Sequence, residues 1–172
     1  MRVSTLFGRV PFSWIVFVRS SIEAALSEGT TVLCDRYAFS GIAFTFAKSS
    51  LASAAPICST RERLTYEWCR APDAGLPAPD LTLFLDISPE AAQLRGGYGD
   101  ERYEKEELQR KVRQVFATIA EDVRRSGGRW VTIDAGRDKD KVRGDIWDYV
   151  RELSCGVELL TLGTLWPENL GL

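Results

Sequence analysis

Histidine is absent from the 172-residue sequence, and this one absence excludes several kinds of site. The chain can build no Ser-His-Asp or Cys-His nucleophile pair, no HExxH zinc helix and no Cys/His zinc finger. General acid and base chemistry would therefore fall to carboxylates, lysines or tyrosines.

The sequence also lacks a long apolar run and an excess of charge of either sign. Its longest apolar stretch, residues 11–18, is too short for a membrane span, which needs about 20 residues. The region before this stretch carries few basic residues, so it does not resemble the start of a signal peptide. Twenty-two basic and 24 acidic residues leave a net charge of −2. We therefore expect no nucleic acid and no membrane as a partner, and an anionic ligand must be held by local positive charge.

Cysteine is scarce, and no two cysteines have the CxxC spacing of a metal or redox site. One of them lies in an apolar run that is typical of a buried strand. We expect reduced thiols and a cytoplasmic location, with the nucleus as the alternative. The four residues are Cys34, Cys58, Cys69 and Cys155.

Strands alternate with helices along the predicted chain, which favours an α/β fold with a parallel sheet covered on both faces. Apolar residues throughout 30–34 indicate a strand buried on both faces. Ser88, Pro89 and Glu90 are typical of a helix start. The predicted strands are residues 30–34, 81–87 and 130–134, and the main predicted helices are residues 20–28, 88–95, 104–125 and 139–153.

Asp35 and Arg36 follow the predicted strand 30–34 and so lie at its carboxyl end, where open α/β sheets bind ligands. A carboxylate there can hold Mg²⁺ or its waters, and a guanidinium can grip a phosphate. An ordinary surface ion pair at a strand end explains the dipeptide equally well.

The stretch DRYAFSGIAF, residues 35–44, resembles the DR(Y/H)xxSGxA(Y/F) signature of the thymidylate kinase family. The resemblance continues through PDAGLPAPDLTLFLDISPEAA at 72–92 and RGGYGDERYE at 95–104 to VTIDAGRD at 131–138. It covers roughly residues 26–150, and the eukaryotic type is the most similar in wording.

This resemblance implies an α/β three-layer parallel sheet of the P-loop nucleoside monophosphate kinase type. It implies phosphoryl transfer from ATP to dTMP, with Mg²⁺ as the cofactor and a homodimer as the assembly. Two alternatives stay open. One is an inactive family member that binds dTMP weakly or associates with a full-length kinase, and the other is a kinase acting on a different monophosphate.

The resemblance also implies roles for individual residues. Arg36 would lie between the donor and acceptor phosphates, and Asp35 would lie near the metal, so these two are the candidate catalytic residues. The residues implied to bind dTMP are Arg36, Ser40, Gly41, Phe44, Tyr103 and Gln109. Phe44 is equally well explained as core packing.

Three arginines are implied on the ATP side, where the glycine-rich segment 95–104 would form a lid. They are Arg95, Arg102 and Arg137. Ordinary alternatives are a solvated helix start for Arg102 and an exposed loop arginine for Arg137.

The sequence departs from the family pattern near its beginning. It contains no phosphate-binding loop of the form GxxxxGK[ST] and no Phe-Pro-x-Arg segment. In the family the strand that leads into this loop lies between the strands that here are residues 30–34 and 81–87. The expected fold therefore misses its first strand and P-loop, and we hypothesise that residues 14–18 partly fill the gap.

We divide the chain into an atypical segment 1–19, a kinase-like domain 20–153 and a tail 154–172 without clear structure. Small polar residues in the insertion 49–63 predict a disordered surface loop. Mistranslated intron sequence in a truncated gene model would explain both the atypical start and the insertion, and a natural short form of the family is the alternative.

Overall fold

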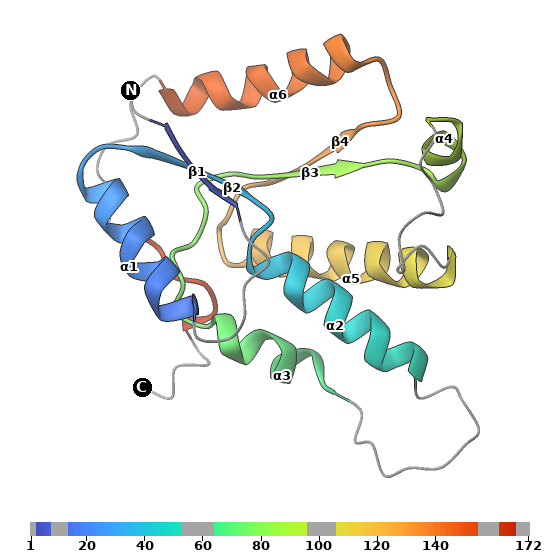
Figure 1. The fold of residues 1–172 in the computed structure, drawn as a ribbon, viewed down its shortest axis with the longest axis horizontal. Helices are drawn as coiled ribbons and strands as arrows, with labels where there is room; N and C mark the ends of the chain where they lie inside the picture. Colours follow the sequence, from blue (N-terminus) through green and yellow to red (C-terminus); the bar gives the residue numbers. More distant parts are fainter. Residues whose placement is uncertain (1–2, 8–13, 53–63, 96–105, 155–161, 168–172) are drawn as a thin grey trace. The chain divides into compact units, whose positions relative to one another are not determined.

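The structure is a computed structural model that describes residues 3–7, 14–52, 64–95, 106–154 and 162–167. Helices alternate with strands along the chain (Figure 1), and every strand pairing between the named strands is parallel. The predicted α/β class with parallel strands is therefore confirmed. The chain forms two compact units.

The first unit comprises Met1–Ala78, Val112–Phe116 and Gly163–Leu172. Its two strands pair in parallel, with Phe7 opposite Asp35. Its elements are β1 (Val3–Phe7), α1 (Trp14–Ser27), β2 (Thr31–Asp35), α2 (Ala38–Ala52), α3 (Tyr66–Arg70) and the short 3₁₀ helix η1 (Ala71–Asp73).

Three expectations about the first unit are wrong. Residues 14–18 belong to α1 and not to a sheet, because a short apolar run is compatible with either structure and here continues the helical pattern that follows it. Strand β1 is present although the sequence pattern does not predict it. Strand β2 is not buried on both faces, since Leu33 is 57% exposed and exposure alternates along it as side chains of a strand must.

Two segments expected to lack structure are partly ordered. Residues 49–52 of the insertion continue α2, and the Leu64 N–H donates to Ser49 Oγ at 3.2 Å; residues 53–63 lie outside the described residues. In the tail, Thr164 forms an antiparallel bridge with Pro77.

The second unit comprises Pro79–Lys111 and Ala117–Leu162. Helix α5 (Glu106–Arg125) supplies residues to both units. The predicted helix start at Ser88 is confirmed, because the Ala91 N–H donates to Ser88 Oγ at 3.2 Å. The other elements are β3 (Thr82–Asp86), α4 (Pro89–Leu94), β4 (Trp130–Asp134) and α6 (Lys139–Ser154), with β3 and β4 paired in parallel.

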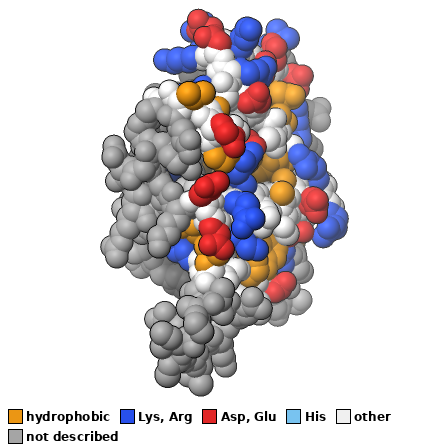
Figure 2. Space-filling model, turned by 90° about the vertical axis from the view of Figure 1, so that its right-hand side faces the viewer, with side chains coloured by type: hydrophobic (Ala, Val, Ile, Leu, Met, Phe, Trp, Pro, Cys, Tyr) orange, Lys and Arg blue, Asp and Glu red, His pale blue; other side chains and the backbone are white. Residues whose placement is uncertain are grey.

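Basic and acidic side chains are interspersed over the described part of the surface seen in Figure 2. That face therefore presents no continuous field of one sign, as the net charge of −2 led us to expect. Among the described helices, none has the length and apolar character needed to cross a membrane.

Candidate functional site

The turn between β2 and α2 has a strained backbone at Arg36. Asp35 is the last residue of β2, and Arg36 follows it with φ of 66°, in the left-handed region. A non-glycine residue in this region costs about 1–2 kcal/mol, and such residues persist where the surrounding structure enforces them, often at functional sites. Both side chains are exposed, so the turn presents a carboxylate and a guanidinium to a ligand.

Helix α2 begins at Ala38, two residues after Arg36. The first N–H groups of a helix have no acceptor inside the helix, and together with the helix dipole they favour anions. The Ser40 N–H already donates to the Tyr37 carbonyl oxygen at 3.1 Å. An arginine at the start of a helix is a local concentration of positive charge that suits a phosphate group.

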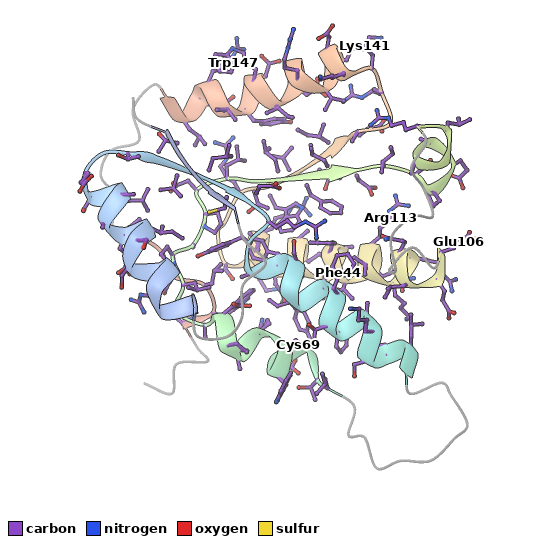
Figure 3. The ribbon with its side chains drawn as sticks, in the orientation of Figure 1. Phe44, Cys69, Glu106, Arg113, Lys141 and Trp147 are labelled. Atoms are coloured by element: carbon purple, nitrogen blue, oxygen red, sulfur yellow. The ribbon has the colours of Figure 1, made fainter. Side chains whose placement is uncertain are left out.

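Ser40, Gly41 and Phe44 share one side of α2. Ile42 and Ala43 are 1% and 0% exposed and lie on the opposite side, because successive residues of a helix are turned by about 100°. Phe44 is half-buried and Gly41 is exposed. Figure 3 shows Phe44 on α2. Phe44 thus lies outside the most buried residues of this helix, and its role in a ligand site stays a prediction.

Tyr37 anchors this turn, a role that the sequence alone did not reveal. Its hydroxyl donates to the Pro77 carbonyl oxygen at 3.0 Å. Burial raises the pKa of the Tyr37 phenol, and the nearby Cys34 and Asp73 raise it further, so the hydroxyl keeps its proton and donates throughout the working pH range. The signal in the sequence was the tyrosine of the DRY motif.

Asp73, in η1, gives the first unit a pH dependence. Burial raises the pKa of this carboxyl from 3.8 to about 6. Between about pH 4 and about pH 6 the unfolded chain loses the proton while the folded chain keeps it. The stability contributed by protonation is therefore full below about pH 4 and is lost as the pH rises to about 6.

We expect Asp73→Asn to raise the free energy of unfolding at pH 7.5 by about 1–2 kcal/mol, discounted for the partial exposure of the carboxyl, and to leave it unchanged at pH 4. Urea unfolding at the two pH values measures this. Asp80→Asn, at an exposed aspartate in the stretch before β3, is the control and should show no such difference. Equal effects of Asp73→Asn at both pH values would contradict the raised pKa of Asp73 in the folded chain.

Two of the three arginines expected on the ATP side lie together in the second unit. The Arg95 guanidinium donates to the Arg137 carbonyl oxygen at 2.9 Å. Arg137 pairs with Asp145 and donates from Nε to the Asp134 carbonyl oxygen at 3.2 Å. Its hydrogen bond to Asp145 raises the pKa of Arg137. Arg137 therefore joins the end of β4 to α6, which supports the structural alternative for it at least as well as a ligand contact.

A polar cavity of about 290 Å³ lies beside Arg137, between β4 and α6. The cavity is lined by Thr132, Ile133, Asp134, Arg137, Asp145, Asp148 and Tyr149.

Of the remaining predicted site residues, Gln109 lies half-buried on α5. Arg102 and Tyr103 lie outside the described residues.

The described residues contain no cluster of side chains that could bind a metal ion without other ligands. Cys34 and Cys69 are free cysteines, and Cys58 and Cys155 lie outside the described residues. Within the described ranges no three cysteine, aspartate or glutamate side chains gather closely enough to hold a metal ion. A metal at Asp35 would therefore need oxygen ligands from a substrate or water.

A family model described as "Thymidylate kinase" matches residues 12–146 of the chain. The chain is 41% identical over 133 residues to the thymidylate kinase of Schizosaccharomyces pombe, a match that covers 77% of the chain and 57% of that relative. It is 40% identical over 148 residues to the Arabidopsis thaliana enzyme, covering 84% of the chain and 49% of that relative. The chain thus spans about half the length of the curated relatives it matches.

The structure is similar to that of thymidylate kinase from Candida albicans. The TM-score is 0.73 at 30% sequence identity, and the match covers 90% of this chain and 69% of that one. The Candida albicans enzyme is described as having broad substrate specificity.

Proposed function

Because this chain belongs to the thymidylate kinase family, we propose that it takes part in the transfer of the γ-phosphoryl group of ATP to dTMP. The family assignment and the structural similarity also establish a fold of the P-loop nucleoside monophosphate kinase type. In the proposed reaction a 5′-phosphate oxygen of dTMP forms a bond to the γ-phosphorus, the bond from that phosphorus to the β–γ bridging oxygen breaks, and ADP leaves.

The observation that carries the proposal is the strained turn at Arg36. Arg36 has an exposed side chain and precedes the first residue of α2 by two positions, so we propose that its guanidinium and the helix start act on one phosphate. Phosphoryl transfer depends mainly on positioning and on neutralising the charge of the phosphoryl oxygens. We propose that Arg36 neutralises this charge, and that Ser40, Gly41 and Phe44 line the dTMP site.

We propose Asp35 as the protein ligand of Mg²⁺, directly or through water. A single exposed carboxylate fits this ion, because Mg²⁺ in phosphoryl-transfer sites keeps several waters and takes its other oxygens from the substrate phosphates. When bound, the ion would offset negative charge on the phosphates.

On the ATP side we propose Arg95, Arg102 and Arg137 as the binding residues, and Tyr103 and Gln109 as further dTMP contacts. The hydrogen bond between Arg95 and the Arg137 backbone supports a common position for these two arginines. The sequence holds no GxxxxGK[ST] motif, so the ATP phosphates would have to be held by other groups. We also propose a homodimer, and a cytoplasmic or nuclear location that fits the free thiols of Cys34 and Cys69.

The proposal is tested by measuring ADP formation from ATP and Mg²⁺ with and without dTMP. The proposal expects ADP only when dTMP is present, and less with dUMP or dAMP at the same concentration. ADP formation that is the same without dTMP would refute it. Binding of dTMP without any ADP formation would favour the inactive alternative.

A substitution at Gly41 tests the effect on stability and the effect on dTMP binding separately. A Cβ added there would meet nothing within 4 Å, so the fold has room for alanine, and alanine in place of glycine stabilises a helix by about 0.5–1 kcal/mol. We expect Gly41→Ala to raise stability by this amount and to weaken dTMP binding about tenfold, because the methyl group enters the proposed site. Thermal unfolding and titration calorimetry measure the two effects.

Gly144 in α6 is the matched control, since a Cβ there would also meet nothing within 4 Å. Gly144→Ala should give a similar gain in stability and leave dTMP binding unchanged. Unchanged dTMP binding in both variants would remove Gly41 from the site.

A further inference from the structure

Residues 163–167 bind the loop that follows η1. The Gly75 N–H donates to the Leu165 carbonyl oxygen, and the Leu165 N–H donates back to the Leu76 carbonyl oxygen, both at 2.8 Å. The Ala78 N–H donates to the Gly163 carbonyl oxygen, also at 2.8 Å. Together with the antiparallel bridge between Thr164 and Pro77, these three hydrogen bonds attach the segment to residues 75–78.

Tyr37 also contacts this loop, because its hydroxyl donates to the Pro77 carbonyl oxygen at 3.0 Å. The same loop residue thus bridges to Thr164 through its backbone and to Tyr37 through its carbonyl oxygen. Tyr37 directly follows Arg36, so the loop connects the 163–167 segment to the strained turn.

Trp166 makes a second connection to the same turn. It is 5% exposed, and its ring meets the Phe39 ring edge to face at 6.0 Å. Phe39 in turn meets Tyr37 edge to face at 6.3 Å. The Arg70 guanidinium lies 5.5 Å from the centre of the Trp166 ring, a cation–π distance.

Trp166 and Arg36 share an unusual backbone. They are the non-glycine residues with positive φ in the described part of the chain, at 46° and 66°. A bulky residue keeps such a conformation only where its surroundings enforce it. Arg36 directly precedes Tyr37 in the chain. Trp166 reaches the same turn by its ring contact with Phe39, and its segment reaches it through the bridge to Pro77, whose carbonyl oxygen accepts from Tyr37.

We propose that residues 163–167 hold the Asp35-Arg36-Tyr37 turn in place, with Trp166 and Tyr37 acting as positioning residues for the Arg36 guanidinium. The proposal rests on the proposed function for its kinetic consequence and on the contacts of the first unit for its structural one. Removing either connection would let the Arg36 backbone relax toward ordinary φ values and move the guanidinium away from the phosphates. A small displacement of such a group costs a large part of the rate.

The structural consequence is tested by backbone hydrogen exchange, which needs no activity. Tyr37→Phe removes only the hydroxyl, and Trp166→Leu removes the ring. Both should speed exchange about tenfold in residues 40–45, the first amides of α2 that have hydrogen-bond acceptors, beginning with the Ser40 N–H that donates to the Tyr37 carbonyl oxygen. Trp147→Leu, at a tryptophan of α6 that is 62% exposed, is the control and should change nothing there. If Trp166→Leu speeds exchange throughout the first unit, the Tyr37→Phe variant decides. Unchanged exchange in residues 40–45 of that variant would overturn the proposal.

The kinetic consequence is tested by a double-mutant cycle with Arg36→Ala. Tyr37→Phe alone should lower kcat about tenfold with little change in KM for dTMP, and it should cost nothing further in the Arg36→Ala background. Losses that multiply in the double variant would show that Tyr37 does not act through Arg36. If the unsubstituted chain forms no ADP, the proposed function fails, while the exchange experiment still decides the positioning role.

Discussion

Replacing Arg36 by alanine is expected to lower dTMP-dependent ADP formation by about 10³-fold. A guanidinium that neutralises the charge of a transferring phosphoryl group contributes on this scale. The methyl group of alanine supplies no charge, and it keeps the backbone strain of a residue at φ 66°. The measurement is kcat/KM for dTMP at saturating ATP and Mg²⁺, with dTMP binding measured alongside it.

Arg36→Gly distinguishes the effect of losing the guanidinium from the effect of backbone strain at this position. Glycine tolerates the left-handed region, so this variant should be about 1 kcal/mol more stable than Arg36→Ala and equally inactive. Arg143→Ala is the control, because Arg143 lies on the surface of α6, where its exposed guanidinium pairs with Asp140 at 3.3 Å. An Arg36→Ala variant with normal kcat/KM would remove this residue from the mechanism, and an Arg143→Ala variant as inactive as Arg36→Ala would show that the loss is not specific.

The second large effect concerns Ile42, which is 1% exposed on the buried side of α2. Ile42→Ala should lower the free energy of unfolding by about 2–5 kcal/mol, since it removes buried carbon and leaves a cavity. That is a large fraction of the roughly 5–15 kcal/mol that stabilises a typical domain. Urea denaturation measures the loss. We also expect weaker dTMP binding, because the same helix carries Ser40, Gly41 and Phe44.

Thr45, three residues along α2 and exposed, provides the comparison. Thr45→Ala should change the stability by less than about 0.5 kcal/mol. Equal losses in the two variants would mean that Ile42 is not the packed side of the helix.

Local signals explain which elements the sequence predicts well. It predicts strand β4 at its observed bounds, and the Ser88 cap and the glycine after α1 mark helix ends through hydrogen bonds made within a few residues. Residues 14–18 are misplaced by the sequence pattern because a short apolar run has no period that distinguishes strand from helix. The same limit applies to β1.

The sequence by itself determined the family, the α/β class and the position of the Asp35-Arg36 pair, because a motif of ten residues and the alternation of strands and helices are written in the order of the chain. Only the tertiary structure decided that Arg36 has a left-handed backbone, that Arg95 meets the Arg137 backbone, and that Trp166 and Tyr37 support one turn. These facts depend on contacts between residues far apart in the chain, such as Phe39 with Trp166. Such contacts form when buried side chains and backbone groups must find partners across the fold, and no local pattern records which partners they find.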